Sequence, residues 1–151
     1  MAIPRLAWVE ISSGAIQNNL KIIKDKVGAE VKIMAVVKAN AYGHGAVGVA
    51  KIAQEENVDY FGVSSFYEAR ELRNNGIKLP ILILGYTPAE NYEDMVNFDV
   101  TATIKNLDVA KAFVTAARRR EKIAKVWVKV DTGMHRLGLE PAQVLYFVKK
   151  L

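Results

Sequence analysis

The sequence predicts an α/β fold built on a parallel β-sheet. Two observations support this prediction. Short apolar runs alternate strictly with helix patterns after residue 32, and the run at residues 33–37 is apolar on both faces, which is typical of a parallel strand covered on both sides. Strict β/α alternation requires parallel strands joined by right-handed crossovers. Two architectures satisfy this pattern, a doubly wound sheet and part of a (β/α)8 barrel. No Gly-x-Gly-x-x-Gly follows the first strand, which counts against a dinucleotide-binding fold.

The N-terminal part is expected to form a short strand at residues 8–11 and then a helix. Ser12 or Ser13 caps this helix, apolar residues recur inside it at helical spacing, and Gly28 ends it. The first buried strand is expected at residues 32–38.

The later elements repeat the same β/α unit. Ser65 and Glu68 have the spacing of a capping box for one helix, Gly76 closes that helix, and Pro88 has the position of the first helical residue in the next. Further strands are expected at residues 60–64, 81–84, 100–103 and 126–130, and further helices at residues 46–56, 107–119 and 141–151, with a loop at residues 131–138.

Composition is that of an ordinary globular domain, with 151 residues of which 51% are hydrophobic and 25% charged. The absence of cysteine excludes a disulfide framework and a thiolate metal site, and we expect no metal. The net charge is +5, but the one basic run, Arg118 to Arg120, falls at a helix end, where cations complement the helix dipole. A solvated helix end is therefore favoured over a phosphate-binding patch, and we expect no nucleic-acid partner. With no signal peptide and no apolar run near the ~20 residues that span a bilayer, we expect a soluble, cytoplasmic chain without a membrane partner.

The candidate catalytic residue is Lys38, at the C-terminal end of the first buried strand, where α/β folds place their chemistry. Alternation places its side chain on the same face as Met34 and Val36. One interpretation is a side chain whose charged head reaches water. The other is an amine that loses its proton in a desolvating site, attacks a carbonyl compound and forms a Schiff base. Gly43 and Gly45, in the small-residue loop that follows, allow a ligand to approach the backbone closely.

Residues 35–45, with the sequence AVVKANAYGHG, resemble the pyridoxal-phosphate attachment motif of bacterial alanine racemases, which are fold-type III pyridoxal-phosphate enzymes. A second match lies at residues 129–138, KVDTGMHRLG, and the resemblance runs across all 151 residues. The family has a barrel followed by a separate β domain. The resemblance therefore implies a (β/α)8 TIM-type barrel, of which this chain supplies about the first five β/α units. Residues 1–151 are expected to be its N-terminal part, with the remaining barrel and the C-terminal β domain absent from this chain.

The resemblance implies an isomerase that interconverts L-alanine and D-alanine and supplies D-alanine for cell-wall peptidoglycan. Lys38 matches the family lysine that holds pyridoxal 5'-phosphate as an imine and acts as one of two bases. The cofactor serves as an electron sink. The opposite base is a tyrosine from the other subunit of a homodimer, in a segment absent here.

Two further residues match cofactor or substrate contacts of the family. Tyr42 matches a residue that hydrogen-bonds the cofactor phosphate, and a packed loop aromatic is the alternative. Arg136 matches an arginine near the cofactor phenolic oxygen and the substrate carboxylate, and a guanidinium suits both groups. The alternative for Arg136 is a pair with a nearby acid. His44, His135 and Met134 are expected to pack in their loops rather than to act in catalysis.

Lys129 is a candidate for carbamylation. Alternation in the fifth strand places Trp127, Lys129 and Asp131 on one face, which is expected to be the barrel interior. A lysine inside a barrel must be paired or neutralised. A salt bridge with Asp131 is one solution. The family offers another, in which the equivalent lysine adds carbon dioxide and becomes an anion that orients Arg136.

Two other functions remain open at this level. One is a pyridoxal-phosphate-binding carrier protein of related barrel fold without racemase activity, and the other is an inactive fragment with inherited motifs. The length of the two motif matches favours the racemase. The stacking histidine and the arginine facing the pyridine nitrogen that the family uses do not fall within residues 1–151, so we expect these residues alone to be incomplete as a catalyst.

Overall fold

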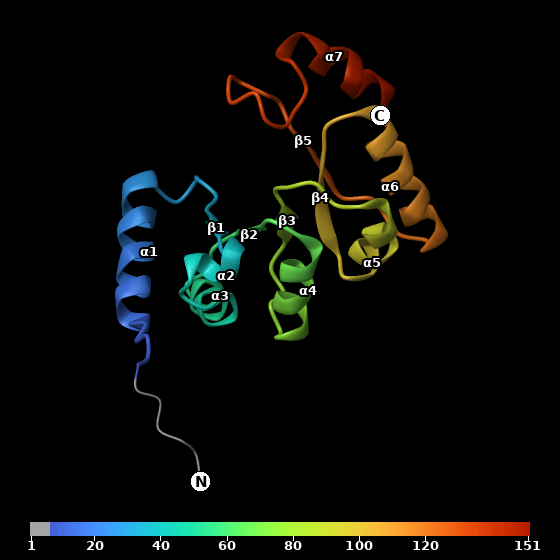
Figure 1. The fold of residues 1–151 in the computed structure, drawn as a ribbon. Helices are drawn as coiled ribbons and strands as arrows, with labels where there is room; N and C mark the ends of the chain where they lie inside the picture. Colours follow the sequence, from blue (N-terminus) through green and yellow to red (C-terminus); the bar gives the residue numbers. More distant parts are fainter. Residues whose placement is uncertain (1–6) are drawn as a thin grey trace.

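The computed structural model describes residues 7–151 and contains five strands and the helices between them (Figure 1). The strands are β1 (Met34–Val36), β2 (Tyr60–Val63), β3 (Ile81–Ile83), β4 (Val100–Ile104) and β5 (Val126–Val128). The helices are α1 (Ser13–Val27), α2 (Lys38–Tyr42), α3 (Ala46–Glu55), α4 (Phe66–Asn74), the 3-10 helix η1 (Ala89–Asn91), α5 (Tyr92–Asn97), α6 (Leu107–Arg119) and α7 (Pro141–Lys150). No helix within residues 7–151 is both long and apolar enough to cross a membrane.

The strands form one parallel sheet in the order β1-β2-β3-β4-β5, so each strand pairs with its neighbour in the sequence. A doubly wound sheet reverses its strand order part-way, at the switch point where it binds ligands. The observed order runs in one direction only, as it does in a (β/α)8 barrel. Figure 1 follows this progression from α1, at one end of the row of elements, to α6 and α7 at the other. The predicted fold class, the first five units of a barrel, is confirmed.

The sheet is curled, as part of a barrel must be. The rings of Tyr60 in β2 and Trp127 in β5 lie with their centroids 5.6 Å apart, although two strands separate β2 from β5. In a flat sheet these strands would lie about 14 Å apart, three strand spacings. The two side chains meet because the sheet bends toward the face that carries them, and this concave face corresponds to the barrel interior.

The main core lies on the other, convex face, between the sheet and the helices. Phe61, Ile81 and Ile83 point to this side and are fully buried, and burying each side chain contributes about 1.5–3 kcal/mol. The helices meet the sheet partly through alanines such as Ala50 and Ala69, which are also fully buried. Small residues let helix and strand backbones approach closely, and so this layer is well packed.

Three sequence expectations need correction at the level of secondary structure. Residues 8–11 do not form a strand. They are exposed coil, because within residues 7–151 the sheet ends at β1 and no strand pairs with them. The first and fifth strands are shorter than expected, since β1 ends at Val36 and β5 at Val128, although Val130 makes an isolated parallel bridge with Leu139. Pro88 directly precedes η1 instead of being its first residue.

The basic run at the end of α6 is exposed, as predicted, and it also has a partner. Arg119 and Arg120 lie 3.3 Å and 2.9 Å from the carboxylate of Glu93 in α5. The run is therefore partly neutralised by the neighbouring helix.

Candidate active site

A cavity of about 300 Å³ opens on the concave face, where the strands end. Lys38, Lys129 and Arg136 line it, together with apolar side chains that include Leu84 and Trp127. Lys38 follows β1 and Lys129 follows β5, the two outer strands of the sheet. The curl of the sheet is what brings these two lysines to one cavity. Three of the four predicted site residues therefore share one place.

The segment that carries Lys38 is a turn of left-handed helix. Residues 39–42 have φ angles between 50° and 54°, a conformation that L-residues rarely adopt and that costs about 1–2 kcal/mol per residue. The following glycines, Gly43 and Gly45, also have positive φ values of 91° and 88°, where glycine carries little penalty. The positive φ angles are therefore not confined to the glycines, because four residues with side chains also adopt them.

Hydrogen bonds hold this turn in place. The amide of Ala41 donates to the carbonyl of Val37 at 2.9 Å, and the amide of Gly45 donates to the carbonyl of Asn40 at 2.9 Å. The side-chain oxygen of Asn40 accepts from the amide of Ala46 at 2.8 Å, and Ala46 is the first residue of α3. Asn40 therefore joins the left-handed turn to the start of the next helix.

Tyr42, the fourth predicted site residue, ends the turn. Its side chain is 62% exposed and is not among the residues that line the cavity. The exposure excludes the alternative of a packed loop aromatic. The phosphate contact implied by the family stays a prediction.

Lys129 is not neutralised by Asp131, so the salt-bridge alternative is wrong in this structure. The carboxylate of Asp131 instead accepts from the amides of Gly133 at 2.9 Å and His135 at 3.0 Å. These two backbone hydrogen bonds are the main reason why the pKa of Asp131 lies below its ordinary value. Among residues 7–151, no ion pair includes Lys129.

The loop that carries Arg136 is pinned at its base. The amide of Asp131 donates to the carbonyl of Leu139, and the amide of Leu139 donates to the carbonyl of Lys129, both at 2.8 Å. A Cβ on Gly138 would lie 2.6 Å from the backbone nitrogen of Asp131, so only glycine fits this crossing. Within the described chain Arg136 forms no ion pair, which removes the alternative of an arginine paired with a nearby acid.

None of the three neighbouring loop residues packs as expected. His44 is exposed, so the expected packing is not seen, and its one contact is local: its Nδ1 atom lies 2.9 Å from the carbonyl oxygen of Ala41. His135 and Met134 do not pack, because both side chains are largely exposed. Met134 lines the cavity, and its exposure places it at the entrance.

Glu68 contacts the turn that follows Lys38. The sequence identifies this residue only as part of a helix cap. The hydroxyl of Ser65 accepts from the amide of Glu68 at 3.4 Å, as a capping box requires. The carboxylate reaches further, to the amide of Ala39 at 2.8 Å and to the amide and hydroxyl of Ser64 at 2.7 Å each. Partial burial raises the pKa of Glu68, but the hydrogen bonds from Ser64 and Ala39 together outweigh it, and the net pKa lies below the ordinary value of 4.5.

The curled parallel sheet and the cationic cavity at its C-terminal edge define the class of the protein, a (β/α)8-barrel protein whose ligand site lies where the strands end. Comparison with known proteins gives the family. The family described as "Alanine racemase, N-terminal domain" matches residues 11–151. The chain belongs to this family.

Individual relatives agree with this assignment. Alanine racemase 1 of Caldanaerobacter subterraneus subsp. tengcongensis is 49% identical over 130 residues, which cover 86% of this chain and 34% of the relative. The structure of alanine racemase from Clostridium difficile 630 in complex with cycloserine has a TM-score of 0.86 and 43% identity, over 89% of this chain and 37% of that one. The structure of a histidine racemase from Leuconostoc mesenteroides has a TM-score of 0.83 and 29% identity, over 91% of this chain and 37% of that one. The chain spans about a third of the length of the curated relatives it matches.

Proposed function

We propose that this chain forms the cofactor-binding part of an alanine racemase, a pyridoxal-phosphate-dependent isomerase that interconverts L-alanine and D-alanine. The observation that carries the proposal is the convergence of Lys38, Lys129 and Arg136 on one cavity at the C-terminal edge of the sheet. Among residues 7–151 none of the three forms an ion pair. Cationic groups without an internal partner suit a ligand that carries phosphate and carboxylate groups.

The residues present fit pyridoxal 5'-phosphate. A primary amine binds its aldehyde, a guanidinium suits its phenolic oxygen, and the cavity of about 300 Å³ is within the range of small-molecule sites. Trp127 and Leu84 supply the apolar wall that a pyridine ring requires. When bound, the cofactor supplies an electron sink that makes the α-proton of an amino acid acidic.

Lys38 and Arg136 then have separate tasks. The Nζ atom of Lys38 would hold the cofactor through its aldehyde carbon and, as a free amine, would accept or return the α-proton of the substrate on one face. The guanidinium of Arg136 binds the substrate carboxylate and so fixes which face the amine of Lys38 meets. Tyr42 donates its hydroxyl to the cofactor phosphate in this proposal.

Racemisation requires a second base on the opposite face, since a single base tends to return the proton to the side it left. In this proposal a tyrosine of the other subunit of a homodimer supplies it, from a segment outside these 151 residues. Residues 1–151 by themselves are therefore expected to turn over alanine very poorly, because residues that act as a unit fail together. The finer context that we propose is cytoplasmic synthesis of D-alanine for peptidoglycan.

We also propose that Lys129 is carbamylated. Asp131 is engaged by the amides of its own loop, so it does not balance the ammonium of Lys129 beside two further cations. A carbamate would convert that cation into an anion and give Arg136 a fixed partner. Carbon-13 NMR with labelled bicarbonate should detect the carbamate carbon. A free amine at neutral pH in the presence of bicarbonate would refute the modification.

The substrate is tested by assaying the full-length protein with single enantiomers. The structural likeness to a histidine racemase at 29% identity makes histidine the second candidate substrate. We expect L-alanine to racemise with a kcat/KM at least tenfold above that of L-histidine. Faster turnover of histidine would reassign the substrate. Cofactor bound at Lys38 without turnover of any amino acid would instead indicate a carrier protein.

A further inference from the structure

We propose that Glu68 is a positioning residue whose carboxylate clamps the left-handed turn of α2 against the end of β2, and so sets where the amine of Lys38 lies. The inference deepens the proposed function and depends on it only in calling that amine catalytic. It assigns to a helix-capping residue a role in the geometry of the site.

The clamp uses both oxygens of one carboxylate. Oε1 accepts the amide of Ala39 at 2.8 Å, and Oε2 accepts the amide and the hydroxyl of Ser64 at 2.7 Å each. Ala39 belongs to α2 and Ser64 directly follows β2, and Glu68 itself lies in the first turn of α4. One half-buried side chain therefore ties together α2, the end of β2 and α4 at the C-terminal edge of the sheet.

The amide of Ala39 belongs to the peptide group that joins Ala39 to Lys38. This amide lies at the start of the left-handed turn, where the first N–H groups of a helical turn have no acceptor within the turn. Glu68 supplies that acceptor. Fixing this peptide group fixes the backbone from which the side chain of Lys38 leaves.

The turn needs such anchors because its backbone is unfavourable at residues 39–42. A strained segment persists only where its surroundings over-determine it. Asn40 anchors the turn to α3 through the amide of Ala46 at 2.8 Å, and Glu68 anchors its start. Without the Glu68 anchor, Lys38 would sample positions outside the cavity.

A carboxylate is better suited to this place than an amide. Three donors meet its two oxygens, so replacing one oxygen by NH₂ sets a donor against a donor. The position in the first turn of α4 also favours an anion, because the helix dipole is positive there. Glu68→Gln therefore keeps the volume of the side chain and removes the clamp.

The test compares Glu68→Gln, Glu68→Asp and a matched control in the full-length protein. Glu71→Gln is the control, since it removes the same charge from the same helix at an exposed position. Three quantities are measured well below the midpoint of thermal unfolding: hydrogen–deuterium exchange of residues 38–42, the rate at which acetic anhydride acylates Lys38 relative to exposed Lys51, and the Kd for pyridoxal 5'-phosphate.

Glu68→Gln is expected to speed exchange of the turn, to raise the relative acylation rate of Lys38 severalfold and to weaken cofactor binding about tenfold, the effect of losing one charge-assisted hydrogen bond. Glu68→Asp should restore part of each change, and Glu71→Gln should change none of them. A lower melting temperature with unaltered exchange and acylation would make Glu68 a stability residue and overturn the proposal, as would equal effects in Glu71→Gln. If the wild-type protein binds no cofactor while exchange and acylation still respond to Glu68→Gln, the positioning role stands and the proposed function fails.

Discussion

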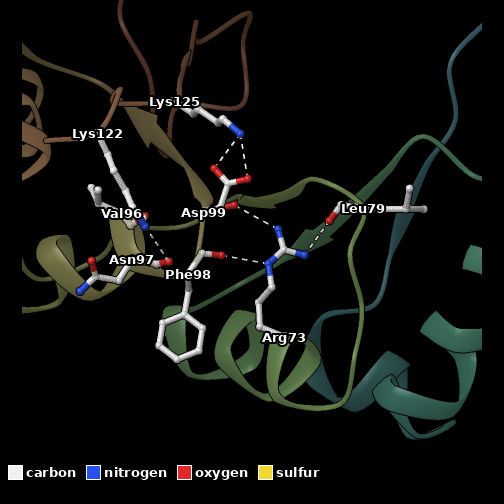
Figure 2. Close-up of polar contacts among 8 residues, drawn as sticks. All are labelled: Arg73, Leu79, Val96, Asn97, Phe98, Asp99, Lys122 and Lys125. Carbon is white, nitrogen blue, oxygen red and sulfur yellow. Dashed lines mark hydrogen bonds and ion pairs between the residues drawn. The ribbon is translucent and has the colours of Figure 1, made fainter. Parts of the chain in front are cut away.

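The two edges of the sheet differ in which side chains bond to their backbone, since cationic donors contact the backbone at the N-terminal edge and side-chain oxygens contact it near Lys38 at the C-terminal edge. At the N-terminal edge, cationic side chains donate to backbone carbonyls, as Figure 2 shows for Arg73 and Lys122. The guanidinium of Arg73 donates over 2.7–3.0 Å to the carbonyls of Ile77, Leu79, Phe98 and Asp99. At the C-terminal edge, the side-chain oxygens of Glu68 and Asn40 accept from backbone amides.

The difference follows from the direction of the helices. In β/α units each helix ends near the N-terminal edge of the sheet, where it leaves carbonyls unpaired, and the next begins near the C-terminal edge, where it leaves amides unpaired. Cations therefore bond to free carbonyls at the N-terminal edge, where Asp59 and Gln54 also accept backbone amides. The side-chain oxygens of Glu68 and Asn40 bond to free amides at the C-terminal edge. The N-terminal edge is completed by the chain's own side chains. At the C-terminal edge Lys38, Lys129 and Arg136 also line a cavity, and it is at this edge that we propose an anionic ligand binds.

Replacing Lys38, at the C-terminal edge, should lower activity without lowering stability, and this loss of activity is the largest effect that we expect. Lys38→Ala in the full-length protein is expected to lower kcat/KM for alanine by about 10³-fold or more, since it removes a group that transfers a proton. The melting temperature should hardly change, because the side chain of Lys38 makes no hydrogen bond or ion pair within residues 7–151. Lys51→Ala, an exposed lysine in α3, is the control. A Lys38→Ala enzyme retaining a tenth of the wild-type activity would refute the assignment.

Replacing Arg73, at the N-terminal edge, should lower the stability of the fold. Burial lowers the pKa of Arg73 from its ordinary value, against the raising effect of Asp99, and the cation makes four hydrogen bonds to carbonyls. Arg73→Ala leaves those carbonyls short of a donor and is expected to cost about 2–4 kcal/mol in urea unfolding. Arg70 is exposed and stacks on the ring of Tyr67 in the same helix. Arg70→Ala should therefore lower the free energy of unfolding by less than about 1 kcal/mol. Equal losses for both arginines would contradict the contrast between the edges.

The pH dependence of stability should depend on Glu68. Its pKa is lower in the folded protein than the ordinary value of 4.5, so the ionised carboxylate stabilises the fold above that value. The contribution is lost as the pH falls through the folded-state pKa. Glu68→Gln should therefore show a flatter fall in the urea midpoint between about pH 5 and pH 3 than the wild type. Parallel curves for the two proteins would indicate that the carboxylate has the same pKa in both states.

The smallest effect is expected at the surface of the N-terminal edge. Lys125 lies 2.6 Å from the carboxylate of Asp99, but both side chains are more than half exposed (Figure 2). Lys125→Ala should cost less than about 1 kcal/mol, and the loss should vanish at about 1 M salt, where exposed pairs are screened. A larger loss that persists in salt would mean that this pair, and not Arg73 alone, holds the edge.

The sequence predicted the five strands of the sheet and the place of Lys38 just after the first of them, because both depend on local patterns. Apolar runs mark the strands, although β1 and β5 are only partly buried, and Lys38 is placed by the end of one such run. The strand expected at residues 8–11 failed for a different reason. A strand needs a neighbour, and the pattern of a segment does not show whether one is present.

The local sequence did not predict the left-handed turn of α2 or the hydrogen bond from Ala39 to Glu68 that anchors it. Asn40 tolerates a positive φ angle, but alanine and tyrosine do not favour one, so the residues at 39–42 do not predict four successive positive φ angles. The contact from Glu68 to Ala39 joins residues 29 positions apart. The capping-box spacing of Ser65 and Glu68 already explains a glutamate at this position, so the sequence offered no reason to expect a second contact. The hydrogen bond that the carboxylate of Asp131 accepts from the amide of Gly133 is predictable from the sequence, since Asp-x-Gly favours a side-chain hydrogen bond to the amide two residues on.

The central claim, that Lys38 is the attachment point of the cofactor, is tested most directly by reduction of the full-length protein with borohydride in the presence of pyridoxal 5'-phosphate, followed by peptide mapping. A pyridoxyl group should appear on Lys38, and Lys38→Ala should lose it while the Lys51→Ala control keeps it. A label on Lys129 or on any other lysine, or no label while the cofactor is bound, would contradict the account.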